Sequence, residues 1–291
     1  MDLSSPHVQH WSDAELFWII QMRYEQTVLV YAKMTSMNLD GNTILITGGG
    51  SGIGRGLATE FHKLGNQVVI AGRRAKALEE TTAANPGMKS IVLDLLDSTN
   101  IRLFAAQIAK EYPAMNVLVN NAGIMRVEDL KNQQSDLADA ESIVATNLLG
   151  PIRLTAALLP LLQKQPAATI ISVSSGLAFV PLHTTPTYCA TKAALHSYTQ
   201  SLRYQLKATE IDVLELIPPY VATDLLGGRS DARAMPLDTF IAEVMAILKA
   251  QPEVKEICVE NVKGLRLAAE RGIYDKVFHG LNASAVHELD S

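Results

Sequence analysis

The chain has few cysteines, no block of basic residues and no histidine pair with HxxxH or HExxH spacing. Its two cysteines, Cys189 and Cys258, cannot form a disulfide framework, so a reducing cytoplasm is the expected location. The scattered histidines argue against a metal site. The formal net charge of −5, without clustered Lys and Arg, argues against binding to nucleic acid.

The N-terminal part also lacks a run of about twenty apolar residues, the length that spans a bilayer. Its most apolar stretch, residues 16–34, is interrupted by charged residues such as Arg23 and Glu25, and no signal-peptide pattern is present. We therefore expect no transmembrane segment. Residues 1–36 are interpreted as an N-terminal extension, either an optional or misassigned start or a peripheral amphipathic anchor, and residues 37–291 as the folded domain.

Hydrophobic residues make up 48% of the 291 positions, enough for the core of one large domain. Short apolar runs predict strands at 43–47, 67–71, 90–93, 116–119, 169–173, 212–217 and 256–259. Amphipathic segments between them predict helices at 53–65, 75–84, 98–111, 136–163, 187–209 and 236–250. This alternation predicts an α/β fold: a single doubly wound, Rossmann-like domain with a seven-stranded parallel sheet flanked by helices.

A glycine-rich turn connects the first predicted strand to the first predicted helix. It contains Gly48, Gly52 and Gly54, with Ser51 and Ile53 among them. Glycines allow a pyrophosphate to approach the backbone closely, and the helix N-terminus supplies unpaired N–H groups. A plain glycine-rich turn is the alternative, but the position between strand and helix favours a dinucleotide site.

The second predicted strand is followed by two arginines, Arg73 and Arg74, where an NAD enzyme usually carries an acid for the ribose. A guanidinium matches a phosphate in charge and bidentate geometry. We therefore expect Arg73 to meet the 2′-phosphate of NADP, with Arg74 as a secondary partner. NADP(H) is favoured and NAD(H) stays open, because Ser51 adds no basic side chain. A solvated charge pair is the alternative.

Tyr188 and Lys192 are four residues apart on a predicted helix and so share a face. A phenol titrates near pH 10, and a nearby ammonium lowers its pKa towards the range useful for acid/base catalysis. Ser175, thirteen residues before Tyr188, can hydrogen-bond a substrate oxygen. A packing tyrosine beside a solvated lysine is the alternative.

The glycine turn, the run from Asn120 to Gly123, Ser175 and the Tyr188-x-x-x-Lys192 pair occur in an order and spacing that resemble the short-chain dehydrogenase/reductase family. The resemblance covers roughly residues 38–282. It implies an NAD(P)-dependent oxidoreductase that moves hydride between the nicotinamide and a carbonyl or secondary alcohol, with Tyr188 as the acid/base.

The same resemblance assigns roles to further residues. Asn147 is implied to hold a water for proton relay, Asp94 to contact the adenine, Asn120 to lie beside the adenosine ribose and Lys192 to bond the nicotinamide ribose. The expected cofactor-binding residues are Gly48, Ser51, Gly52, Ile53, Gly54, Arg73, Arg74, Asp94, Leu95, Asn120, Ala122, Gly123, Tyr188, Lys192, Val221 and Thr223.

Pro218-Pro219 stands where the family usually has Pro-Gly, and a proline cannot adopt a glycine-only turn. Together with Thr223, this resembles the oxidoreductases related to the protein of the D-alanyl-lipoteichoic acid operon.

Residues 224–236 are the expected substrate lid. The resemblance also implies a homodimer or homotetramer. A function of another class, a non-catalytic dinucleotide sensor or scaffold, uses the same fold but tends to lose the tyrosine or lysine.

Overall fold

A computed structural model of the protein describes residues 37–131, 136–226 and 231–285. The expected N-terminal extension, residues 1–36, lies outside the described residues, and so do Gly227 and Gly228 of the expected lid. The described strands are β1 (Thr43–Thr47), β2 (Gln67–Gly72), β3 (Lys89–Val92), β4 (Met115–Asn120), β5 (Ala168–Val173), β6 (Ile211–Leu216) and β7 (Glu256–Ile257).

The strands form one parallel sheet in the order β3-β2-β1-β4-β5-β6-β7. Every residue of β1 and β5 is buried, as expected for strands covered on both faces. The chain runs outwards from β1 to β3, then crosses back to β4 beside β1. The predicted doubly wound fold with seven parallel strands is confirmed.

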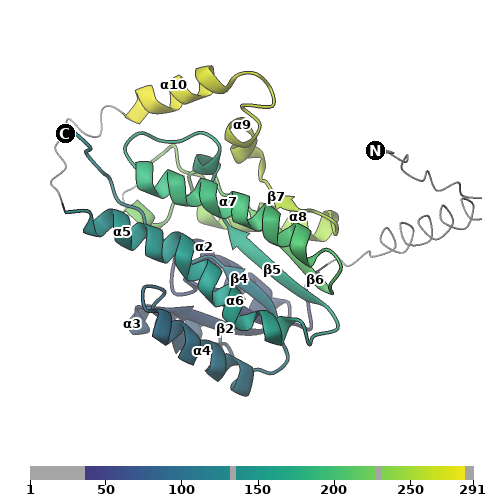
Figure 1. The fold of residues 1–291 in the computed structure, drawn as a ribbon. Helices are drawn as coiled ribbons and strands as arrows, with labels where there is room; N and C mark the ends of the chain where they lie inside the picture. The colour runs from purple at the N-terminus through teal and green to yellow at the C-terminus, as the bar shows by residue number, and fades with distance from the viewer. Residues whose placement is uncertain (1–36, 132–135, 227–230, 286–291) are drawn as a thin grey trace, which may run out of the picture. The chain divides into compact units, whose positions relative to one another are not determined.

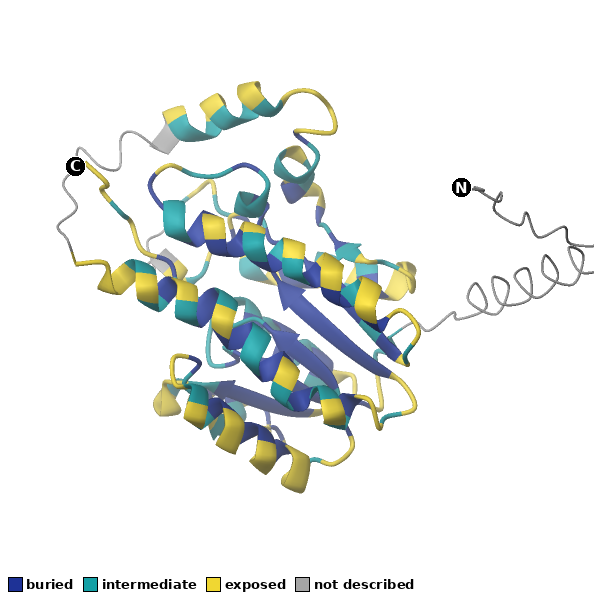
Figure 2. Ribbon diagram, in the orientation of Figure 1, coloured by how far each residue is buried: buried dark blue, intermediate teal, exposed yellow. Residues whose placement is uncertain are grey.

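Helices cover both faces of the sheet (Figure 1). Apolar residues of α2 (Gly52–Lys63) and α8 (Leu237–Ala250) pack into one core. Those of α4 (Ser98–Glu111), α6 (Gly150–Leu162) and α7 (Pro186–Leu206) pack into the other. Figure 2 shows α7 with its buried residues towards the sheet and its exposed residues on the outside. The remaining long helix between strands is α3 (Ala75–Ala84).

The predicted helix at 136–163 is three consecutive segments: α5 (Ala138–Val144), a π-helical turn η1 (Ala145–Leu149) and α6. By length and composition Ala138–Leu162 could also cross a membrane, but 44% of its most apolar window is buried inside the protein. A helix that covers a sheet has the same apolar composition, so this segment is weak support for a membrane span.

The C-terminal part differs from prediction. The strand predicted at 256–259 is shortened to β7, because the chain turns at η4 (Glu260–Val262) into α9 (Lys263–Arg266). A further helix, α10 (Tyr274–Ala285), follows. In Figure 1, α9 and α10 lie beyond the end of β7, towards the N-terminal end of α7. Neither helix was predicted: α9 is only four residues long, and the amphipathic pattern of α10 was not recognised.

Candidate functional site

A cleft of about 680 Å³ opens where β1, β4, β5 and β6 end. Gly48, Asn121, Ser174 and Pro218, each close behind one of these strands, line it. In an open parallel sheet, ligands bind at the carboxyl ends of the strands where the chain order reverses. The order β2-β1-β4 places that reversal beside β1.

Most of the residues predicted from the sequence come together in this cleft. They are Gly48, Ser51, Gly52, Ile53, Arg73, Arg74, Asp94, Leu95, Ala122, Gly123, Ser175, Tyr188, Lys192, Val221 and Thr223. The lining does not include the other three, Gly54, Asn120 and Asn147. Their contacts within the protein explain why.

The glycine turn forms a tight cradle at the start of α2. Gly48 has a φ of +70°, and a Cβ there would lie 2.8 Å from Nδ2 of Asn121. A Cβ on Gly54 would lie 2.4 Å from the carbonyl oxygen of Gly48, so this glycine permits turn and helix to pack. Ser51 precedes α2 without capping its N–H groups. These donors and the absence of side chains suit a pyrophosphate.

Two arginines and one acid stand at the outer end of the cleft, past β2 and β3. Arg74 donates a 2.7 Å hydrogen bond to the hydroxyl of Ser51, and Arg73 beside it is exposed. Asp94 accepts a 3.0 Å bond from the backbone N–H of Leu96, which fixes its carboxylate in a turn. This end therefore carries two cations close to the phosphate cradle.

The two asparagines after β4 have different surroundings. Asn120 is buried and donates from Nδ2 to Oγ1 of Thr155, away from the cleft. Its neighbour Asn121 lines the cleft and joins the ends of β4 and β1 through 2.9 and 3.0 Å bonds to Thr47. The resemblance pointed to Asn120, whereas Asn121 of the same run is the one exposed to the cleft.

Three side chains meet at the inner end of the cleft. Ser175 follows β5, and Tyr188 and Lys192 share one face of α7. The Ser175 hydroxyl lies near enough to the Tyr188 phenol to lower its pKa. The Nζ of Lys192 lies 5.5 Å from the centre of the Tyr188 ring and donates a 2.7 Å bond to the carbonyl of Val173. Ser175, Tyr188 and Lys192, which were selected by their spacing in the sequence, therefore lie together in the structure.

Burial dominates the protonation of this group. It raises the pKa of the Tyr188 phenol well above its ordinary value, and the Ser175 hydroxyl offsets this only in part. Burial also lowers the pKa of Lys192 to about 8, while the charge of Glu215 acts in the opposite direction. The pKa of Tyr188 is therefore raised rather than lowered in this structure, because desolvation outweighs the effect of Ser175.

Asn147 is a buried connector in the π-helical turn η1. Its Oδ1 accepts from the backbone N–H of Ile124, and its Nδ2 donates to the Ile124 carbonyl, both at 2.8 Å. A longer 3.3 Å bond reaches Oγ1 of Thr191 on α7. π-Helical turns occur often at functional sites. Here the turn presents Asn147 to the segment after β4 and to the helix that carries Tyr188.

The segment after β6 forms the wall opposite the glycine turn. Val221 and Thr223 line the cleft, and a parallel bridge from Val221 to Met235 anchors the segment. No described non-glycine residue has a positive φ, so Pro219 stands in ordinary backbone. The Pro218 carbonyl accepts a 2.9 Å bond from the N–H of Gly176, which links this wall to the loop after Ser175.

Apolar side chains from late in the chain close the inner end, and sequence reasoning missed them. Leu265 and Leu281 join Leu177 and Leu182 in the lining. Asn282 of α10 accepts from the backbone N–H of His183 at 2.7 Å and donates to the Pro181 carbonyl at 3.1 Å. His183 itself lies outside the lining of the cleft.

Comparison with known proteins agrees with this geometry. The family described as short chain dehydrogenase matches residues 42–234. The uncharacterized oxidoreductase DltE of Bacillus subtilis is 41% identical over 249 residues, which is 84% of this chain and 98% of DltE. The NADP-dependent 3-hydroxy acid dehydrogenase of Schizosaccharomyces pombe is 33% identical over 192 residues, covering 64% of this chain and 74% of that protein.

Solved structures share the fold. A short chain dehydrogenase of Burkholderia cenocepacia, in complex with NADP, has a TM-score of 0.71 at 22% identity and covers 83% of this chain and 99% of its own. A short-chain dehydrogenase of Sphingobium yanoikuyae, in complex with NADPH, has a TM-score of 0.69 at 22% identity, with 81% and 94% covered. The chain therefore belongs to the short-chain dehydrogenases, as an NAD(P)-dependent oxidoreductase of the subgroup that contains DltE.

Proposed function

We propose that the protein is an NADP(H)-dependent enzyme that transfers hydride between the nicotinamide and a carbonyl or secondary alcohol substrate. Tyr188 is the acid/base, Ser175 binds the substrate oxygen and Lys192 supports the tyrosine. The observation that carries this proposal is the meeting of these three side chains at the inner end of the dinucleotide-sized cleft.

The arrangement suits proton transfer to a carbonyl oxygen. Because burial keeps the proton on Tyr188, its hydroxyl is available as the acid. Ser175, beside that hydroxyl, can donate to the same substrate oxygen as negative charge develops on it. When bound, the cofactor supplies the hydride for the carbonyl carbon. The ammonium of Lys192 then favours the phenolate that remains, and alcohol oxidation reverses these transfers.

The arginines support a preference for NADP(H). Arg73 and Arg74 line the outer end of the cleft, and the adjoining Asp94 is engaged in its own turn. A guanidinium forms strong, bidentate bonds with a phosphate. The Schizosaccharomyces pombe relative is named as NADP-dependent, which agrees with this choice. We further propose a cytoplasmic location, since both cysteines are free.

The competing function, a cofactor sensor without catalysis, is less well supported because the chain keeps Ser175, Tyr188 and Lys192 in one group. The test is oxidation of NADPH in the presence of a panel of aldehydes and ketones, with Tyr188→Phe as the matched variant. We expect Tyr188→Phe to bind NADPH like the parent protein but to lose roughly 10²–10⁴-fold in turnover. Turnover within about threefold of the parent would contradict the acid/base role.

A further inference from the structure

Strand β6 places an acid where its neighbours on the same face are apolar. Ile211 and Val213 point into the core beneath α7, and Glu215 continues that alternation. The Glu215 side chain is 0% exposed. A buried carboxylate is costly unless charged or polar partners compensate it, so its retention calls for an explanation.

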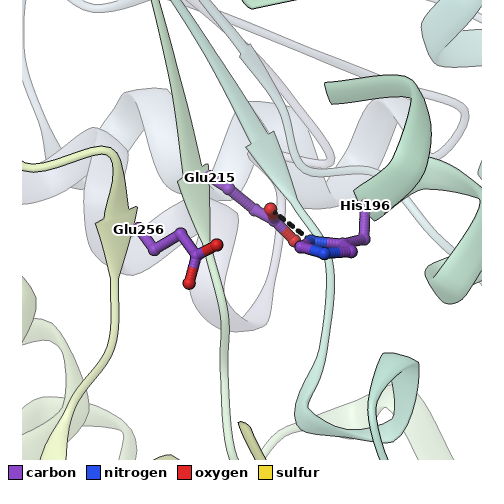
Figure 3. A group of neighbouring side chains, drawn as sticks. All are labelled: His196, Glu215 and Glu256. Atoms are coloured by element: carbon purple, nitrogen blue, oxygen red, sulfur yellow. Dashed lines mark hydrogen bonds and ion pairs between the residues drawn. The ribbon is translucent and has the colours of Figure 1, made fainter. Parts of the chain in front are cut away.

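One oxygen of Glu215 has a partner and the other does not. Oε2 accepts from Nδ1 of His196 at 2.7 Å, the contact drawn as a dashed line in Figure 3. Oε1 is buried and, among the residues that the structure describes, has no hydrogen-bond partner. The carboxylate is therefore only half satisfied by direct contacts.

The carboxylate belongs to the same layer as the catalytic lysine. His196 follows Lys192 by one helical turn on α7, so the two side chains share a face. The Nζ of Lys192 donates to the Val173 carbonyl, and Val173 pairs in register with Leu216, the neighbour of Glu215. Lys192 and Glu215 thus both enter the interior between α7 and the strands β5 and β6.

The adjacent acid, Glu256, is matched by a different cation. It pairs in register with Glu215, and its carboxylate accepts 2.7 and 3.2 Å bonds from Arg266. His196, Glu215 and Glu256 offer ligand atoms within 4.8 Å of one another (Figure 3), but the Arg266 guanidinium already engages both oxygens of Glu256. A metal ion would have to displace this arginine, so the cluster is better explained by charge pairing within the protein.

Other ionisable groups near Glu215 form hydrogen bonds with other partners or stay uncharged. Arg203 of α7 donates to the carbonyls of Val213 and Lys255, although its charge also interacts with Glu215. Cys258, after β7, holds its proton because burial raises the pKa of the thiol to about 11. Among the facing groups in the described chain, Lys192 remains as the buried amine whose protonated form the Glu215 charge can favour.

We propose that Glu215 is a positioning residue for Lys192: its buried carboxylate, oriented by His196, is the countercharge that keeps the lysine protonated beside the catalytic tyrosine. The proposal rests on the proposed function for its consequence, the support of Tyr188 by an ammonium. The pKa of Lys192 agrees in direction, since burial lowers it to about 8 and the charge of Glu215 opposes that fall.

The experiment compares Glu215→Gln with Glu256→Gln in the full-length protein. Lysine is labelled with ¹³C at Cε, the Lys192 signal is assigned by its loss in Lys192→Met, and its titration is followed by NMR. We expect Glu215→Gln to move the Lys192 titration to lower pH by at least about half a unit, since losing an opposite charge in the same buried layer disfavours the ammonium. Glu256→Gln should leave it unchanged.

A second readout tests the functional consequence. With NADPH and an accepted carbonyl substrate, the loss of kcat/KM at high pH should begin at a lower pH in Glu215→Gln, because removing a negative charge lowers the pKa of both Lys192 and Tyr188. If Glu215 had a purely structural role, its replacement would change the melting temperature without moving the pH at which kcat/KM declines. Glu215→Leu, which matches the apolar neighbours and removes the unpartnered Oε1 atom, serves if the Gln variant does not fold.

The outcomes separate the two proposals. A Lys192 titration that is the same in the parent protein and in Glu215→Gln, or in Glu215→Leu where that variant is used, overturns the role of Glu215. A shifted titration in a protein that reduces no carbonyl in the panel supports the role of Glu215 and counts against the proposed function instead. An equal shift in Glu256→Gln would assign the effect to general charge loss and also overturn the proposal.

Discussion

Arg74 donates a 2.7 Å hydrogen bond from its guanidinium to the hydroxyl oxygen of Ser51. This contact links the end of β2 to the glycine turn, so the phosphate cradle and the ribose end of the cleft are one connected surface. It also gives the two arginines different roles. Arg74 braces the turn, whereas Arg73 is exposed beside it and available to a ligand phosphate.

Arg73→Ala should remove much of a preference for NADP(H) over NAD(H). A charge-assisted bond to the 2′-phosphate contributes about 1.5–3 kcal/mol, or roughly ten- to a hundredfold in affinity. Binding of NAD(H) should change little, and added salt should weaken NADP(H) binding more than NAD(H) binding. Fluorescence titration of both cofactors measures these effects.

Arg74→Ala is the matched comparison for this prediction. Because Arg74 holds Ser51, its loss should weaken both cofactors to a similar degree by loosening the glycine turn. Equal dissociation constants for NADP(H) and NAD(H) in the parent protein would show that Arg73 is only a solvated charge.

Asn147→Ala should lower stability more than it disturbs cofactor binding. The substitution leaves the backbone N–H and carbonyl of Ile124 without their 2.8 Å partners. Losing partners of buried polar groups costs about 1–3 kcal/mol each. Urea denaturation should therefore show a lower midpoint, while Tyr188→Phe should unfold near the parent. An unchanged midpoint would mean that Asn147 is held in place by other contacts and serves chemistry alone.

The long helices should support self-association. Val144 and Leu149, on the α5–η1–α6 segment, are 36% and 37% exposed, and the predicted homodimer or homotetramer would cover them. Light scattering at micromolar concentration should give a dimer or tetramer, and Leu149→Lys should shift it towards monomer. Leu103→Lys on α4, where the leucine is 66% exposed, should have no effect. A parent protein that is monomeric would show that these helix faces serve only the sheet.

The apolar residues of α7 give little further support for self-association. Leu195, Leu202 and Leu206 are buried within the chain itself. Ala190 is exposed, and Ala194 and Tyr198 are half-buried. A 21-residue helix with apolar residues on several sides does not reveal from sequence which stripe faces its own sheet.

The fold could be predicted because its signals are local and repeated. Apolar runs marked the strands, and the glycine turn marked the β1–α2 junction where Gly48 needs a positive φ. The catalytic spacing was equally local, since Tyr188 and Lys192 are one helical turn apart. Family resemblance then supplied the roles.

Other features depend on contacts that no short window contains. The clasp of Asn282 on residues 181 and 183 joins positions about a hundred residues apart. That Asn121 rather than Asn120 lines the cleft follows from how β4 ends against Thr47. In the sequence, Glu215 is one charged residue within an apolar run. Its burial is evident only in the structure, where α7 covers this face of β6.

The buried ammonium of Lys192 should make stability depend on pH in a defined window. Its pKa in the folded protein is about 8, against 10.5 ordinarily. Below pH 8 both states carry the proton and the burial cost is fully present. Between pH 8 and 10.5 the folded state has released the proton while the unfolded state still holds it, so stability rises with pH.

Lys192→Met lacks this titration, although it also loses the bond to Val173. The stability of the parent relative to Lys192→Met should therefore increase by about 3 kcal/mol from pH 7 to pH 10.5. Thermal denaturation across this range measures the difference, with Lys249→Met, an exposed lysine on α8, as the control that should show no such trend. A constant difference between the parent and Lys192→Met would mean that the lysine is solvated well enough to titrate as it does in the unfolded chain.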